Sequence, residues 1–250
     1  MEYTNFVFII PVFNCEDIIQ KTLFSVLQQD YPYWKIMIRS DQSTDRTPQR
    51  IEDFIKTFNL KEKINLVCTE RKMGEVENYL EASKLIDDNE VICRLDGGDW
   101  LTNTSCLVYL DQYYKQHEPA IVWTKQDWAY HPEYNISGPL PHGDDTNVYR
   151  DLLDNWKVSH LKTWRKKEIN DINDLNYRWE NGQYAQIGCD RYCVLPILHK
   201  AGLEKRKRLF LPIYCYHYSI DLSNPNLFTE ERSIRQRKSV EYLHKRGFLE

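Results

Sequence analysis

Two short apolar runs in the first hundred residues break abruptly into carboxylates and turn formers. One run ends at Asp41, and the other ends in Asp96, two glycines and Asp99. A third apolar run, residues 6–10, precedes both of them. One such ending is usually a solvated turn, but a parallel α/β sheet holds its ligands outside the carboxyl ends of its strands. We therefore expect the three aspartates to face one crevice that binds a metal-bound nucleotide.

Strand and helix signals alternate along the chain, which is typical of an α/β fold. The expected strands of the first half are residues 6–10, 34–39, 64–68 and 91–95, with helices between them over 18–27, 47–58 and 74–86. In the helix over 74–86, the spacing places Val76, Leu80 and Leu85 inward. Crossover helices between strands imply parallel pairing. The first hundred residues are therefore interpreted as a nucleotide-binding half.

The second half is less regular. The expected elements are a helix over 106–114, a strand over 121–124, an irregular stretch over 126–150, a helix over 187–201, a strand over 209–216 and a charged helix from about 229. An irregular stretch of that length inside a compact domain is usually functional or mobile.

Composition narrows the class of protein. At 250 residues the chain can form one large α/β domain, and no linker-like stretch divides it. No stretch approaches the roughly 20 apolar residues that cross a bilayer, so we expect no transmembrane segment and a cytoplasmic location. The seven cysteines are scattered singly, which favours reduced thiols. A net charge of −4 gives no general argument for a nucleic-acid partner.

Four motifs occur in an order and at separations that resemble the signature of family 2 glycosyltransferases with the GT-A fold. They are FIIPVFN at 8–14, SDQSTDRT at 40–47, GxxxNxxxA at 74–82 and LDGGD at 95–99. The resemblance is close over residues 5–115 and loose beyond. It implies an α/β domain of the GT-A type over 1–250, with a mixed, mostly parallel sheet flanked by helices. Residues to about 115 would bind the nucleotide sugar, and those from about 116, with the C-terminal helix, would bind the acceptor.

The activity that the resemblance implies is an inverting transfer of a sugar from a nucleoside diphosphate donor to an acceptor hydroxyl. Six residues would bind the donor: Pro11, Asn14, Asp41, Asp96, Lys162 and Arg165. Asp41 stands where the family contacts the base, and a carboxylate can accept the N3 hydrogen of uracil, so a UDP-sugar is favoured. Lys162 or Arg165 would neutralise the phosphates, although their segment is equally typical of a solvated helix start.

The metal motif departs from the family. The usual Asp-x-Asp-Asp is replaced by Asp96-Gly97-Gly98-Asp99, so the middle carboxylate, which commonly holds the cation, is absent. Asp99 remains as a ligand for Mn²⁺ or Mg²⁺, because both ions take hard oxygen ligands and accept diphosphate oxygens and water for the rest. His217 is a second candidate ligand, with a packed core histidine as the alternative. A metal-independent enzyme is also consistent with this motif.

An inverting transfer needs a base that takes the acceptor proton, and Asp190 is the candidate. It follows Cys189, which stands where the family more often has an acid, and it opens a predicted helix. The alternative is an ordinary acid favoured by the helix dipole. Glu180 is the substitute base.

The acceptor is left open as a hydroxyl on a glycan, a protein or a nucleic acid. Tryptophans and tyrosines of the second half suit stacking on sugar rings, although aromatic residues are first of all core residues. The main rival is a catalytically degenerate protein of the same fold that binds a nucleotide sugar or a glycan. A nucleotidyltransferase is disfavoured, because residues 11–14 are not a glycine-rich basic phosphate loop.

Overall fold

The computed structural model describes residues 3–128, 156–201, 208–219 and 229–250. Its elements are, in chain order, β1 (Phe6–Val12), α1 (Ile19–Leu27), β2 (Trp34–Ser40), α2 (Thr47–Thr57), β3 (Ile64–Cys68), α3 (Glu75–Ser83), β4 (Val91–Arg94), α4 (Cys106–His117), β5 (Ile121–Trp128), β6 (Lys162–Arg165), the 3-10 helices η2 (Lys166–Ile169) and η3 (Asp174–Tyr177), α6 (Cys189–Lys200), β7 (Arg208–Tyr218) and α7 (Glu230–Arg246). The strands and helices predicted for the first 117 residues are all present.

The seven described strands form one sheet in the order β3-β2-β1-β4-β6-β5-β7. Four of its six neighbouring pairs are parallel, and the two pairs that β6 makes with β4 and β5 are antiparallel. The prediction of a mixed, mostly parallel α/β sheet is therefore confirmed. The antiparallel strand β6 inserts between β4 and β5, although it comes about seventy residues after β4 in the sequence.

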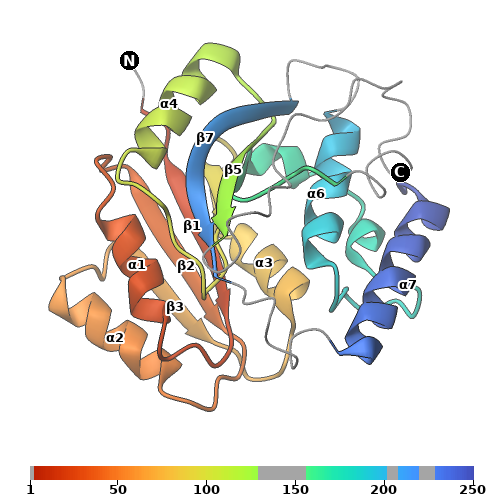
Figure 1. Ribbon diagram of the computed structural model, residues 1–250, viewed down its shortest axis with the longest axis horizontal. Helices are drawn as coiled ribbons and strands as arrows, with labels where there is room; N and C mark the ends of the chain where they lie inside the picture. The colour runs from red at the N-terminus through yellow and green to blue at the C-terminus, as the bar shows by residue number, and fades with distance from the viewer. Residues whose placement is uncertain (1–2, 129–155, 202–207, 220–228) are drawn as a thin grey trace.

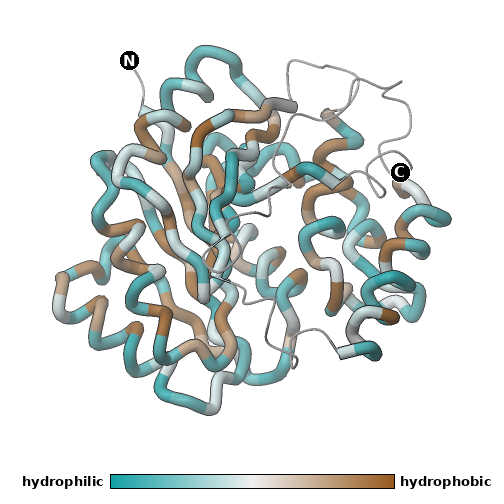
Figure 2. Tube along the Cα trace, in the orientation of Figure 1, coloured by the Kyte–Doolittle hydropathy of each residue, from teal (hydrophilic) through white to brown (hydrophobic). Residues whose placement is uncertain are grey.

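Helices cover both faces of the sheet, so the central strands are apolar on both sides (Figure 1). In β1, Phe6, Phe8 and Ile10 pack into a core with residues of α1, α2 and α4. The alternating residues Val7 and Ile9 pack into a second core with residues of α3, α6 and α7. This alternation is the period of two that a strand imposes. Figure 2 shows the result as hydrophobic central strands inside outer helices that are largely hydrophilic.

Two expectations about local structure are wrong. Helix α3 ends at Ser83, so Leu85 lies beyond its last turn and is 64% exposed instead of pointing inward. The segment that contains Lys162 and Arg165 is not a solvated helix start, because it forms β6 and its backbone is paired on both sides. The irregular stretch expected over 126–150 is wrong at its start, because residues 126–128 continue β5, and its remainder lies outside the described residues. Among the helices that the structure describes, none is long and apolar enough to cross a membrane.

Candidate functional site

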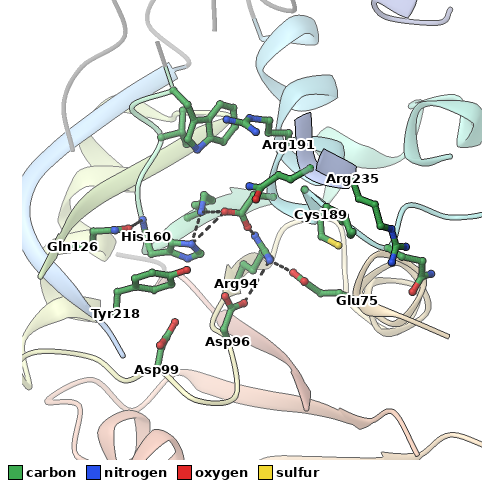
Figure 3. Close-up of a pocket in the computed structure, with 18 of the residues that line it drawn as sticks. Glu75, Arg94, Asp96, Asp99, Gln126, His160, Cys189, Arg191, Tyr218 and Arg235 are labelled. Atoms are coloured by element: carbon green, nitrogen blue, oxygen red, sulfur yellow. Dashed lines mark hydrogen bonds and ion pairs between the residues drawn. The ribbon is translucent and has the colours of Figure 1, made fainter. Parts of the chain in front are cut away.

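A cavity of about 730 Å³ opens at the carboxyl end of β4, between the sheet and the helices α6 and α7. Figure 3 shows side chains from α3, β4, β6, α6 and α7 converging on it. Its lining includes four of the residues predicted from the sequence: Asp96, Asp99, Lys162 and Asp190. The edge of the sheet where ligands were expected is therefore the edge where the structure has its cavity.

The turn after β4 is shaped by Gly97. A Cβ built on Gly97 would lie 2.6 Å from the Val12 side chain at the end of β1, closer than real Cβ atoms approach. Gly98 is different: a Cβ there would be 3.6 Å from Ser219 Oγ, an ordinary contact, and its φ is not positive. Neither the backbone conformation nor the surroundings of Gly98 therefore require a glycine. Gly97 lets the turn pass close to β1.

Asp99 is held by protein donors. The Tyr216 hydroxyl donates to Asp99 Oδ2 at 2.6 Å, and the Ser219 N–H donates to Oδ1 at 2.8 Å. The same Tyr216 oxygen accepts the Asp96 N–H at 3.3 Å, so it links the two aspartates. Burial, and then repulsion from Asp96, raises the pKa of Asp99 to about 6. These contacts leave the Asp99 carboxylate little exposed to the cavity.

Arg94, the last residue of β4, carries most of the ionic contacts in the cavity. Its side chain is 4% exposed and pairs with three carboxylates, those of Glu75, Asp96 and Asp190. Burying an unpaired guanidinium costs a large amount of free energy, so Arg94 needs these three acids as partners at its buried position. Nothing in the sequence singles out Arg94, because a lone arginine at a strand end carries no pattern.

Lys162 lies beside Arg94 on the adjacent strand β6. Its ammonium, 1% exposed, donates to Asp190 Oδ2 at 3.0 Å and to His160 Nε2 at 2.7 Å. Burial, and then repulsion from Arg94, lowers the pKa of Lys162 well below its usual value. Burial and the two cations also lower the pKa of His160, so its ring is neutral with the proton on Nδ1. Nδ1 makes no hydrogen bond with a described residue.

Asp190 stands in the first turn of α6 and points into the cavity. Gly188, which precedes the helix, has φ +69°, and a Cβ there would be 3.3 Å from Ser239 Oγ of α7. This close approach of α7 fixes where α6 begins and so aims Asp190. Its oxygens are both engaged, Oδ1 by Arg94 and Oδ2 by Lys162, with His160 Nε2 at 3.4 Å from Oδ2.

Asp41 lies outside the cavity lining and is 5% exposed. Burial opposes its ionisation, but N–H donors of Met73 and Gly74 at 2.8 and 2.9 Å outweigh that effect and lower its pKa. Lys72 Nζ is 3.4 Å from Asp41 Oδ2 and 3.1 Å from the centre of the Phe13 ring, which is 52% exposed. An exposed aromatic face thus lies next to the predicted base-reading carboxylate.

The remaining predicted residues also lie outside the cavity lining. Pro11 belongs to β1, and Asn14 ties the following loop to Thr44, whose N–H donates to Asn14 Oδ1 at 2.8 Å. Arg165 contacts the Asn89 carbonyl and the Tyr114 ring. Glu180, the substitute base, is exposed and does not line the cavity either.

His217 points away from Asp99. Its ring stacks on Trp100 with centroids 4.4 Å apart, and its Nδ1 is 3.5 Å from Asp127 Oδ2. Its neighbour Tyr216 is the residue that reaches Asp99, and successive side chains of a strand point to opposite faces.

The donor atoms present do not fit a divalent cation. In the part of the chain that the structure describes, no group of three or more histidine, cysteine, aspartate or glutamate side chains is placed to hold a metal ion. Both Asp99 oxygens accept protein hydrogen bonds, and Asp96 pairs with Arg94. A divalent cation needs free carboxylate oxygens as ligands, but carboxylates in this cavity pair with the two buried cations Arg94 and Lys162.

Sequence reasoning missed Glu75, Arg94, His160 and Arg191 among the cavity residues. Only His160 had a usable signal, because it lies two residues before Lys162 in the segment already singled out. Arg191 stacks over Trp156, with its guanidinium carbon 5.5 Å from the ring centre, and burial lowers its pKa.

The family model described as glycosyl transferase family 2 matches residues 7–173. A protein of Bacillus subtilis (strain 168), TuaG, which is by name a teichuronic acid biosynthesis glycosyltransferase, is 36% identical over 66 residues. The match covers 26% of this chain and 25% of TuaG, so the chain spans about a quarter of the length of this curated relative.

Solved structures share the fold. TarS 1-349 of S. aureus in complex with UDP-GlcNAc is 16% identical with a TM-score of 0.66, over 99% of this chain and 68% of that one. The mannosyltransferase PcManGT of Pyrobaculum calidifontis, in complex with GDP-Man and Mn²⁺, is 15% identical with a TM-score of 0.61, over 90% of this chain and 59% of that one. The predicted GT-A fold is thereby confirmed.

Proposed function

The chain belongs to glycosyl transferase family 2, a family of glycosyltransferases, and we propose that it moves a sugar from a nucleoside diphosphate donor to an acceptor hydroxyl with inversion. The observation that carries this proposal is the position of Asp190. It lies in the first turn of α6 and lines the cavity together with Asp96, which follows β4 and is labelled in Figure 3. A carboxylate so placed can take the proton of a hydroxyl that attacks a sugar held between them.

We propose that the donor nucleoside lies on the β1 to β2 side of the cavity. Phe13 offers an exposed ring for stacking on the base, and Lys72 and Asp41 border that ring with a cation and a carboxylate. Asp96 then faces the ribose or the diphosphate. The carboxylate of Asp41 supports a UDP-sugar as donor. The two structural neighbours hold UDP-GlcNAc and GDP-Man, so the experiment has to separate these bases.

The acceptor side of the cavity is formed by α6, α7 and the aromatic residues between them. Trp156 and Arg191 stack on each other there, and Arg235 of α7 lines the same wall. These residues support acceptor binding by the second half of the chain, from about residue 116 to the C-terminal helix. The acceptor is a hydroxyl of a glycan, a protein or a nucleic acid, and the residues of this wall do not distinguish among these three.

A binding protein without turnover is the second candidate function. The observation that favours it is that both oxygens of Asp190 are already occupied by cations. Turnover separates the two candidates, because a binding protein would hold a nucleotide sugar without consuming it.

The test measures the melting temperature with UDP-GlcNAc, other UDP-sugars and GDP-mannose. Binding stabilises the folded state by RT ln(1 + [L]/Kd), about 2.7 kcal/mol at a hundredfold excess over Kd. We expect larger shifts with UDP-sugars than with GDP-mannose, and we expect Phe13→Ala to reduce them. Phe58→Ala, at the C-terminal end of α2, is the matched exposed aromatic. Equal shifts for all nucleotide sugars, or none at all, would contradict the assignment of donor.

A further inference from the structure

Arg94 and Lys162 form a pair of buried cations at the floor of the cavity. Their side chains are 4% and 1% exposed, so water cannot solvate either charge. Each is instead paired with carboxylates that line the cavity, and none of these partners belongs to the two hydrophobic cores. A fold that only needed packing here would have used apolar side chains, since a buried ion pair is often no more stable than an apolar replacement.

The diphosphate of a nucleotide sugar needs positive charge. Negative charge grows on the leaving diphosphate as the sugar departs, and arginine, lysine or a metal ion can stabilise it. The described carboxylates do not fit a metal ion, because Asp99 is hydrogen-bonded by Tyr216 and Ser219 and Asp96 pairs with Arg94. The basic side chains at the floor of the cavity are Arg94 and Lys162, whereas Arg191 and Arg235 lie in the wall assigned to the acceptor.

In this structure the Asp190 carboxylate pairs with both of these cations. Arg94 binds its Oδ1, and Lys162 donates to its Oδ2 at 3.0 Å. A phosphate group could bind the two cations in the same way, because it too presents two oxygens that are bonded to one atom. While both oxygens are held by these cations, neither is free to accept the proton of an acceptor hydroxyl. Asp190 is 30% exposed and stands on the rim of the cluster, so it can turn away without exposing the core.

We propose that Arg94 and Lys162 bind the diphosphate of the donor in place of a divalent cation, and that Asp190 occupies these two charges until the donor displaces it. The inference rests on the proposed function. Displacement would free the Asp190 oxygens for the acceptor hydroxyl only once the donor is bound. Glu75 and Asp96 stay on Arg94 and keep its guanidinium directed at the cavity. The binding order is therefore donor first and acceptor second.

The lead experiment measures the binding of inorganic pyrophosphate, UDP and uridine by calorimetry in EDTA. Asp190→Asn keeps the shape of the side chain and removes the competing charge. We expect it to bind UDP and pyrophosphate about tenfold more tightly than the parent, the size of one charge-assisted hydrogen bond. Uridine has no phosphate, so its affinity should stay the same. Asp171→Asn, at an 89% exposed aspartate outside the cavity, is the matched control and should change nothing.

A second set of variants tests the cations. Arg94→Met and Lys162→Met should weaken UDP and pyrophosphate about tenfold or more, while Lys167→Met, at an exposed lysine, should not. Circular dichroism checks that each variant is folded. Arg94→Lys keeps the charge and should retain part of the affinity if Arg94→Met does not fold.

Adding Mn²⁺ in excess over EDTA should leave the UDP affinity of the parent within about twofold. The inference is overturned if Mn²⁺ tightens UDP about tenfold, or if Asp190→Asn binds pyrophosphate no more tightly than the parent. The first of these outcomes leaves the proposed function standing with a metal. Failure of every nucleotide and of pyrophosphate to bind overturns both proposals.

Discussion

Asp99 should make the protein less stable as the pH rises, and Asp99→Asn should remove that loss. The carboxyl is 4% exposed, and its pKa is raised from 3.8 to about 6 by burial and by Asp96. A raised pKa in the folded state means that the folded protein holds the proton more tightly than the unfolded chain. Its contribution to stability is thus fully present below pH 3.8 and is lost as the pH rises through about 6.

The magnitude follows from the shift. One pKa unit corresponds to about 1.4 kcal/mol, so a rise of about two units costs on the order of 3 kcal/mol at neutral pH. Asparagine is neutral like the protonated acid, and its Oδ1 can accept the Ser219 N–H, but its Nδ2 cannot accept the Tyr216 hydroxyl hydrogen. Losing that acceptor costs about 1 kcal/mol at every pH. We therefore expect Asp99→Asn to be more stable than the parent by about 1 to 2 kcal/mol at pH 7.5 and less stable than the parent near pH 4.

The assay is urea unfolding followed by circular dichroism between pH 4 and 7.5, with the midpoint as the readout. Asp171→Asn, at an 89% exposed aspartate, controls for the general effect of removing a charge. A difference between Asp99→Asn and the parent that stays constant across this range would refute the reasoning. So would a variant that is less stable than the parent at pH 7.5.

Two further pairs of substitutions test the site. Gly97→Ala should destabilise the protein by about 1 to 3 kcal/mol, because its Cβ would overlap Val12. Gly98→Ala, with ordinary contacts and no positive φ, should keep the parent melting temperature, and equal effects at the two glycines would contradict this explanation of the turn. Asp190→Asn should lower the rate of sugar transfer about a hundredfold or more, and Glu180→Gln should leave it unchanged, as measured by release of nucleoside diphosphate; parent-like turnover by Asp190→Asn would place the base elsewhere.

The elements of the first half could be predicted because each carries a local signal. Strand β3 occupies the residues expected for it, and the apolar run of β1 identified a strand covered on both faces. Strand β6 lacked such a signal, because four residues that include a lysine and an arginine have no apolar alternation. Its place is set by pairing with β4 and β5, which no short-range pattern encodes.

The candidate site was predicted in part for the same reason. Asp96, Asp99 and Asp190 stand in motifs, and the structure brings them to one cavity together with Lys162. Arg94 is recognisable only through its partners, since a buried cation becomes informative once its carboxylates are known. The assignment of His217 and Asp99 to one metal site came from the family resemblance, and alternation along β7 directs His217 to the face opposite Tyr216, which holds Asp99. The roles of the predicted residues in donor and acceptor binding remain predictions.

The insertion of β6 beside β4 has a consequence for how the chain folds during synthesis. Val91 of β4 pairs with Arg165, so one edge of β4 stays open until some seventy more residues have been made. Such distant pairings are slow to form, and an open strand edge can pair with another chain. When β1 to β4 have been synthesised, most of the sheet can form, but the floor of the cavity is incomplete. Lys162 is part of β6, the strand that later pairs with the open edge of β4. The floor of the cavity and the cover for the open edge of β4 are supplied in the same step.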